Sequence, residues 1–341
     1  MTNPIETSNG AGLAAIEAEM ARQVADSIAS ISAVKDRATE VAAALRATGR
    51  LLLLGMGASH AAGRIVEPIY RSLGIEAIAL PISEQLTAPL PTGDKVVLVA
   101  SQSGESAEVI RWLDLVRPSG IVFGLTLDGA STLARSVPSL IGAGGAEIGF
   151  AATRSLTVTL ALHAAILAEL GVDPALAIAA LQAPPAVDDL SLAVSTLAAA
   201  RAVVSSGREL HGVADALALG ICELARIPAF ALEGGQFRHG PLEMLGPEVG
   251  VILVRSDEVG APLVAGAATA ALDAGSPVVV FDSSAQPPIL GAVTFAFPVA
   301  KGLAAVFAML LVVQRLMLGL AGARVADVGT PKRSSKITRT E

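Results

Sequence analysis

The segment 101–106 reads Ser-Gln-Ser-Gly-Glu-Ser and brings three hydroxyls, an amide and a glycine together within six positions. It follows an apolar run at 96–100 and precedes a stretch with helical spacing, so we expect a turn from a buried strand into a helix. Free N–H groups and the dipole at a helix N-terminus attract anions. Added hydroxyl donors predict a site for a phosphate monoester, whereas a helix cap alone needs one such residue. The predicted phosphate ligands are Ser101, Gln102, Ser103 and Ser106.

A second turn, 55–60, follows the apolar run 51–54 and supplies another hydroxyl, Ser59. Because the carboxyl ends of neighbouring parallel strands meet at one edge of a sheet, we expect Ser59 to join the phosphate site. The glycines of this turn half resemble a dinucleotide-binding fingerprint, but the third glycine of that pattern would fall on His60. A nicotinamide-dependent dehydrogenase therefore stays the weaker alternative.

Two further side chains, Glu223 and His239, have the chemistry of a general base and a general acid. Glu223 lies in an apolar helical stretch, where a carboxylate is costly unless it faces a polar site or a partner. An i,i+3 ion pair with Arg226 is the structural alternative. His239 lies in the stretch 232–241, where we expect no regular element, and a plain surface histidine is the alternative there.

The other reactive side chains predict no further site. Cys222 is the single cysteine and lies in the same apolar stretch as Glu223, so we expect it to be packed and not nucleophilic. The four histidines show neither a close pair nor a His-Glu-x-x-His motif, so we predict no metal site.

The elements that must position these residues alternate between apolar runs and helical stretches, which predicts an α/β fold with parallel sheets covered on both faces. The first helical stretch covers 13–45, and a helix is expected at 108–116. The second half repeats the plan at an offset of about 150 residues, so we predict two tandem domains joined near the proline pair at 184–185. The predicted strands contain 51–54, 77–80, 96–100, 121–125, 202–204, 251–254 and 277–281. The predicted domains are 1–180, 181–326 and a polar, basic tail at 327–341.

Composition narrows the class of protein. The 341 residues are 52% hydrophobic and only 3% aromatic, so Ala, Leu, Val and Ile must build the core. The net charge of −7 argues against binding to nucleic acid or to anionic membranes. The start has no basic and apolar leader, and the apolar run 303–323 carries Gln314 and Arg315 at its middle, so we expect a buried helix and a cytoplasmic protein.

Taken in order, these segments resemble the sugar isomerase (SIS) family, above all the isomerase half of glucosamine-6-phosphate synthases and their stand-alone relatives. The family's Ser-Gln-Ser-Gly-Glu-Thr turn matches 101–106, with Ser106 in place of threonine. Its Glu-Ile-Gly-Val-Ala-Ser-Thr-Lys stretch matches 147–154, which adds Glu147 to the predicted substrate site, although Ala152 replaces a serine. Its Lys-His-Gly-Pro segment matches 238–241, and its terminal Lys-Ser-Val-Thr-Val-Glu matches 336–341.

The resemblance implies two tandem SIS-type α/β/α sandwich domains and a catalytic set of Glu223, His239 and Lys336, with Glu223 sixteen residues before His239 as in the family. It implies that the tail covers the site, that His239 comes from a neighbouring subunit of a homodimer with shared active sites, and that no cofactor is required. Gly220 stands where the family has a second lysine. The chain also lacks a cysteine at position 2, so we expect no built-in glutaminase to supply ammonia.

The resemblance therefore favours hydrolytic deamination of an amino-sugar phosphate, with glucosamine 6-phosphate converted to fructose 6-phosphate and ammonia. Lys336 would either stabilise an oxyanion or form a transient imine. An ammonia-independent aldose–ketose phosphosugar isomerase and a fructosyl-amine phosphate deglycase are the alternatives. A regulatory module that senses a sugar phosphate would need the serine turns but not Glu223, His239 and Lys336.

Overall fold

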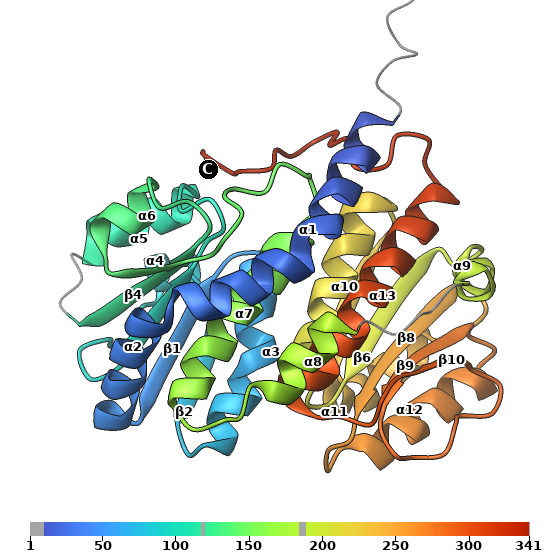
Figure 1. Ribbon diagram of the computed structural model, residues 1–341. Helices are drawn as coiled ribbons and strands as arrows, with labels where there is room; N and C mark the ends of the chain where they lie inside the picture. The colour runs from blue at the N-terminus through green and yellow to red at the C-terminus, as the bar shows by residue number, and fades with distance from the viewer. Residues whose placement is uncertain (1–9, 117–119, 184–188, 341) are drawn as a thin grey trace, which may run out of the picture. The chain divides into compact units, whose positions relative to one another are not determined.

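The computed structural model describes residues 10–116, 120–183 and 189–340 and divides the chain into two compact units. The unit called here the first consists of residues 15–178 and 331–340. The second consists of residues 10–14 and 179–330. The predicted junction at 184–185 lies outside the described residues. Each unit contains a five-stranded sheet, and every strand pair in both sheets is parallel (Figure 1).

The sheet of the first unit has the strand order β2-β1-β3-β4-β5. Its strands are β1 (Arg50–Gly55), β2 (Glu76–Pro81), β3 (Val96–Ala100), β4 (Ile121–Thr126) and β5 (Ser139–Ile141). Its helices are α2 (Lys35–Thr48), α3 (Ala58–Ser72), α4 (Glu84–Thr87), α5 (Ala107–Val116), α6 (Thr132–Ser136) and α7 (Arg154–Glu169). Two more, α1 (Ala11–Ala33) and α8 (Ala175–Gln182), extend across the division between the units.

Both faces of this sheet are covered, because alternate side chains of a strand point to opposite sides. On one face, Leu52 and Leu54 of β1 pack with Trp112 of α5. On the other face, Gly63 of α3 approaches Leu53 so closely that an added Cβ would lie 3.4 Å from the leucine Cβ. The continuous apolar strands of the sequence are therefore explained by burial on two sides.

The sheet of the second unit has the order β7-β6-β8-β9-β10, which is the same succession as in the first. Its strands are β6 (Ala202–Gly207), β7 (Ala229–Glu233), β8 (Val249–Ser256), β9 (Val278–Ser283) and β10 (Val293–Ala296). Its helices are α9 (Ser191–Leu197), α10 (His211–Leu224), α11 (Gly234–Arg238), α12 (Ala261–Asp273) and α13 (Gly302–Gly322), with a 3₁₀ turn at Pro241–Met244.

Helix α13 is long and apolar enough to cross a membrane, but 78% of its apolar window is buried inside the protein. Gln314 is buried with it, and Arg315 points to the exposed side. The expectation of a buried core helix is confirmed.

All seven predicted strands are present. The three strands that were missed, β5, β7 and β10, all lie at a sheet edge. The expectation of no regular element at 232–241 was wrong, because this stretch contains the end of β7, all of α11 and the start of the 3₁₀ turn. The expectation that Cys222 is packed was also wrong. Helix α10 buries Leu217, Ile221 and Leu224 along one face, and Cys222 falls outside that face.

Candidate active site

The serine turn, residues 101–106, joins β3 to α5 at the carboxyl edge of the first sheet, as predicted. Ser101 and Ser103 are each only 5% exposed. Gly104 has a φ of +61°, and a Cβ there would lie 2.2 Å from Ser131 Oγ. Only glycine fits this position, because it tolerates a positive φ and leaves room for the Ser131 side chain.

The hydroxyls of the serine turn converge on its backbone. Ser101 Oγ lies 3.3 Å from Ser106 Oγ and accepts a hydrogen bond from the Gly104 N–H at 3.1 Å. Ser103 Oγ accepts the Glu105 N–H at 3.2 Å. The turn is thus held in one conformation with hydroxyls and N–H groups close together, an arrangement that suits a small oxyanion.

Gln102 links the serine turn to the segment before α7. Its carbonyl accepts hydrogen bonds from Leu127 N and Thr126 Oγ1, which fixes the turn to the end of β4. Its side-chain Oε1 accepts the Glu147 N–H at 3.1 Å. Two residues that were predicted only from separate motifs are therefore in direct contact.

The Glu147 carboxylate is buried at the N-terminus of α7. It accepts hydrogen bonds from both the N–H and the hydroxyl of Thr153 and of Ser155. It also accepts a bond of 2.6 Å from Lys336 Nζ. The structure thus brings the predicted lysine of the tail to the predicted glutamate.

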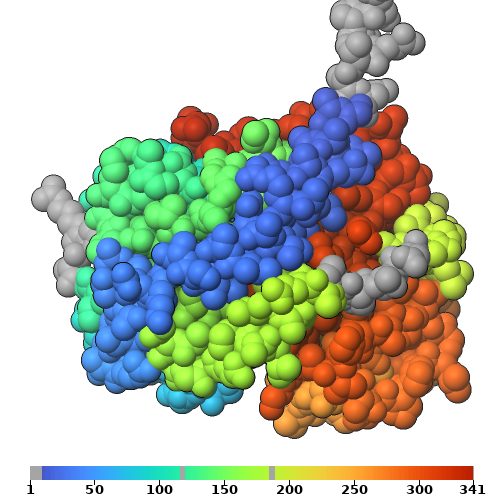
Figure 2. All heavy atoms as spheres, viewed as in Figure 1, coloured from blue at the N-terminus to red at the C-terminus, as the bar shows by residue number. Residues whose placement is uncertain are grey.

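The tail makes a second contact with the site. The carbonyl of Thr338 accepts the N–H of Ala107, the first residue of α5, at 2.9 Å. Part of the tail, in red, lies at the surface in Figure 2. While the tail lies there, this N–H at the start of α5 is not available to an anion.

Ser59 lies in the turn between β1 and α3. Strand β1 pairs with β3, with Leu54 opposite Val99, so both turns leave the same edge of the sheet. Gly55 permits the sharp turn, because a Cβ there would lie 2.7 Å from the carbonyl carbon of Ser59. That Ser59 shares a ligand with the serine turn stays a prediction.

Glu223 and His239 belong to the second unit. Glu223 lies half-buried near the end of α10. Arg226 donates to Asp327 Oδ1 at 2.7 Å and to the carbonyl of Thr330 at 2.8 Å. Its guanidinium therefore binds the last residues of the second unit. His239 is exposed and follows α11 as its C-terminal cap residue. Their catalytic roles stay predictions.

Sequence analysis missed the pair that fixes α11. The Glu233 carboxylate caps this helix by accepting the N–H groups of Gly235 and Gln236, and Arg208 Nη1 lies 3.1 Å from Glu233 Oε1. Burial alone would raise the pKa of Glu233, but the two N–H donors and Arg208 outweigh it and lower the pKa. The sequence carries only a weak signal for this cap, a glutamate directly before two glycines, because Ser, Thr, Asp and Asn are the side chains preferred at a helix N-cap.

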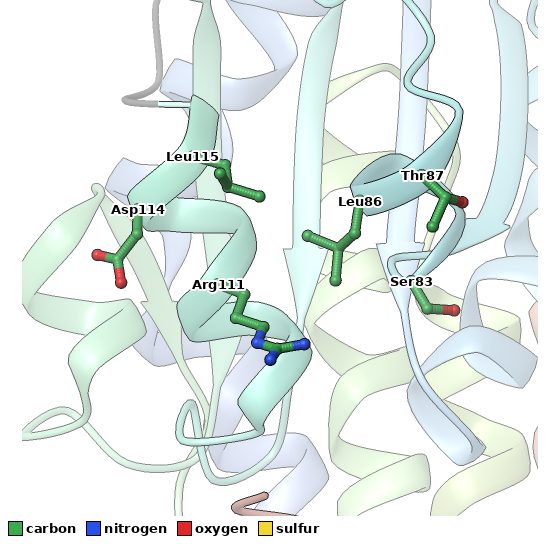
Figure 3. A pocket seen from close by; sticks show the side chains of 6 residues that line it. All are labelled: Ser83, Leu86, Thr87, Arg111, Asp114 and Leu115. Carbon is green, nitrogen blue, oxygen red and sulfur yellow. The ribbon is translucent and has the colours of Figure 1, made fainter. Parts of the chain in front are cut away.

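The first unit also has an open groove between α4 and α5, of about 500 Å³. In Figure 3, Leu86 and Leu115 point toward each other across it, whereas Asp114 points away. None of the predicted site residues lines it. Within the described ranges, no three His, Cys, Asp or Glu side chains gather as a metal-binding cluster.

Comparison with known proteins finds similar sequences among the glutamine–fructose-6-phosphate aminotransferases. No family model matches the chain. A glutamine–fructose-6-phosphate aminotransferase from Sulfurisphaera tokodaii is 29% identical over 252 residues, and one from Aeropyrum pernix is 31% identical over 264. These alignments cover 71% and 70% of this chain but only 42% of either relative. The chain therefore spans less than half the length of each.

Solved structures agree with these relatives. The C-terminal domain of the glucosamine–fructose-6-phosphate aminotransferase from Francisella tularensis superimposes with a TM-score of 0.79 at 18% identity, covering 92% of this chain and 97% of that one. This chain belongs to the sugar isomerase (SIS) family.

Other solved structures share the SIS fold at 19% and 20% identity. One is a tagatose-6-phosphate ketose/aldose isomerase from Escherichia coli, with a TM-score of 0.76 and coverage of 93% of this chain and 96% of that one. Another is a glucosamine-6-phosphate deaminase from Thermotoga maritima, with a TM-score of 0.70 and coverage of 92% and 99%. The family is a group of phosphosugar isomerases and amino-sugar enzymes, and this SIS chain shares their α/β architecture.

Proposed function

We propose that this SIS protein converts glucosamine 6-phosphate and water to fructose 6-phosphate and ammonia. The observation that carries the proposal is the contact chain from the serine turn through Gln102 and Glu147 to Lys336. It links a lysine, through Glu147 and Gln102, to a turn suited to an anion, which supports the proposal. A phosphate-sensing module would need the turn but not the lysine.

In the proposed reaction, the hydroxyls and N–H groups of the serine turn hold the phosphate and fix the position of the reacting end. His239 moves a proton between O5 and O1 to open the ring. Glu223 moves the proton from C2 to C1 through an enediol-type intermediate. Water then adds to the C2 ketimine, and the C–N bond breaks as ammonia leaves.

Deamination is distinguished from plain isomerisation by its product. We would measure ammonia with glutamate dehydrogenase and fructose 6-phosphate with a coupled isomerase, for the wild type and for Glu223→Gln. The wild type should release both products in equal amounts. Glu223→Gln should lower turnover by about 100-fold or more while binding of the sugar phosphate stays near wild type. Glu248→Gln, an exposed glutamate of the second unit, is the matched control.

Formation of ketose without ammonia from glucose 6-phosphate or another aldose phosphate would instead assign the isomerase activity. Hydrolysis of a substituted fructosyl-amine phosphate to an aldose phosphate and the free amine would assign the deglycase. No change in proton exchange at C2 in Glu223→Gln would remove Glu223 from the mechanism.

We also propose two tandem SIS domains, a cytoplasmic location and a homodimer in which His239 acts on the neighbouring copy's substrate. Mixing Glu223→Gln with His239→Asn tests the shared site. If each site combines Glu223 of one copy with His239 of the other, hybrid dimers contain one intact site and regain activity. If both residues act within one copy, hybrids regain none.

A further inference from the structure

Glu147 is placed by the sequence motif among the substrate ligands, but its surroundings leave it no room for that role. Its side chain has 0% exposure. Four donors from Thr153 and Ser155 and a fifth from Lys336 already fill its two oxygens, at distances of 2.6 to 3.2 Å. A carboxylate offers about four lone-pair sites, so a sugar hydroxyl finds none open.

The loop that carries Glu147 is fixed from behind by a buried arginine. Arg154 is fully buried, and its Nε lies 2.5 Å from Glu19 Oε2. Its other nitrogens donate to Asp26 and to the carbonyls of Ala143 and Gly145. The loop therefore cannot shift without breaking a buried ion network, which is costly.

The same network reaches the loop from α1. Glu19 Oε1 accepts the N–H of Ile148, the residue after Glu147, at 2.7 Å. Gly144 has a φ of +87°, and a Cβ there would lie 2.0 Å from Asp26 Oδ2. The backbone on both sides of Glu147 is thus clamped, and the carboxylate presents a fixed partner to the tail.

We propose that Glu147 is a positioning residue that holds Lys336 as a charged ammonium beside the serine turn, so that the lysine acts as a fixed cation and hydrogen-bond donor and not as an imine-forming amine. An imine requires a neutral amine that is free to attack C2 of the sugar, whereas Nζ here donates to a buried carboxylate. This inference resolves the two roles open for Lys336, and its catalytic part rests on the proposed function.

The first test needs no turnover. Hydrogen exchange of residues 331–340 is compared between the wild type, Glu147→Gln and Glu40→Gln, which removes a carboxylate from an exposed ion pair. Loss of the anchor should speed exchange of the tail by about tenfold, and Glu40→Gln should leave it unchanged. Because Glu147 is buried, Lys336→Met breaks the same pair from the more exposed tail side and leaves the carboxylate its four donors from Thr153 and Ser155. Unchanged tail exchange in both variants would overturn the anchoring whatever the enzyme catalyses.

The second test concerns the charge. Lys336→Arg keeps a cation but cannot form an imine, so it should keep turnover within about tenfold of wild type, whereas Lys336→Met should lose about 100-fold with little change in KM. Treatment with borohydride in the presence of fructose 6-phosphate should leave the mass of the protein unchanged. A reduced hexose phosphate adduct on Lys336, or a Lys336→Arg variant as inactive as Lys336→Met, would contradict the proposal.

The two tests separate this inference from the reaction. A wild type that releases no ammonia from any amino-sugar phosphate would sink the proposed function while leaving the exchange result to decide the anchor. A normal ammonia yield together with an adduct on Lys336 would keep the function and reject the fixed-cation role.

Discussion

The carboxyl edges of the two sheets share a strand order but differ in chemistry. After β3, the first sheet presents the hydroxyls of the serine turn, whose one carboxylate, Glu105, accepts the N–H and the hydroxyl of Thr132. After β8, which holds the matching place in the second sheet, come Asp257 and Glu258. Glu209, which follows β6, accepts the Gly260 N–H before α12. These carboxylates disfavour an anion at the second edge, so the prediction of a phosphate site applies to the first unit alone.

The crowding of carboxylates at the second edge affects the pKa of Glu258. Burial raises the pKa of this carboxyl, and the neighbouring charge of Glu209 raises it further, against the Gly302 N–H and Lys301. Like charges that crowd in this way disfavour ionisation and exclude a further anion. The serine turn has three hydroxyls and one carboxylate, whereas Asp257, Glu258 and Glu209 gather at this edge.

Both units bury ion pairs, since the first contains Arg154 with Glu19, but the first unit also buries a neutral polar pair. The second unit buries the ions Arg255 and Asp282, joined by two hydrogen bonds at the ends of β8 and β9. The first unit buries Tyr70 against His163, with the phenol oxygen 3.1 Å from Nδ1. Removing one ion leaves the other charge uncompensated, whereas the neutral pair responds to pH. Each difference predicts a measurement.

The largest effect is expected from Arg255→Met. Asp282 would keep only neutral donors from Ser284 in a buried place, so the free energy of unfolding should fall by about 3 to 5 kcal/mol. Arg201→Met removes an exposed pair with Glu248 and should cost about 0.5 kcal/mol or less. Thermal and urea unfolding measure both. An equal decrease in the free energy of unfolding in the two variants would show that the buried Arg255 pair contributes no more to stability than the exposed one.

Ser103→Asp copies the chemistry of the second edge into the serine turn. A carboxylate beside the bound phosphate should raise KM for the sugar phosphate by about 100-fold, with a smaller change in turnover. Ser195→Asp adds the same charge to an exposed position of α9 and should leave KM unchanged. A normal KM in Ser103→Asp would mean that the phosphate binds elsewhere.

The stability of the first unit should depend on pH through His163. Burial lowers the pKa of His163 to about 3, from 6.5 in the unfolded chain. Between pH 6.5 and 3 only the unfolded chain takes up the proton, so stability should fall by about 1.4 kcal/mol for each unit that the pH drops. Above pH 6.5 this loss is absent.

Fluorescence of Trp112, the single tryptophan and fully buried in the first unit, reports this unfolding. His163→Gln should flatten the pH dependence, and His239→Gln serves as a control for losing an imidazole elsewhere. An unchanged slope in His163→Gln would place the acid sensitivity in other groups.

The smallest effect is expected from Ser103→Ala. One hydroxyl donor is lost, so KM for the sugar phosphate should rise about fivefold while stability stays near wild type. Ser72→Ala, at the exposed end of α3, is the matched control. An unaltered KM would show that the Ser103 hydroxyl does not bind the phosphate and only accepts the hydrogen bond from the Glu105 N–H.

The sequence predicted most strands and the serine turn because continuous apolar runs and clustered hydroxyls are local signals. It missed β5, β7 and β10, which are three of the four edge strands, where burial and thus the apolar pattern is weaker. Most residues of α10 are apolar, so its sequence does not distinguish the exposed face from the buried face. Cys222 was for that reason predicted to be packed.

The sequence offers candidate residues for the site but not the network of contacts that joins some of them. Nothing local tells that Arg154 is fully buried or that it meets Glu19, 135 positions away. The contact of Lys336 with Glu147 likewise joins residues 189 positions apart. Such contacts depend on how the chain returns to the first unit, which no spacing rule describes.

A crystal structure with fructose 6-phosphate tests the central claim most directly. The phosphate should lie within hydrogen-bond distance of the Ser101, Ser103 and Ser106 hydroxyls, with Lys336 still on Glu147. A saturated complex with the phosphate bound anywhere else, and the serine turn unchanged, would contradict the account.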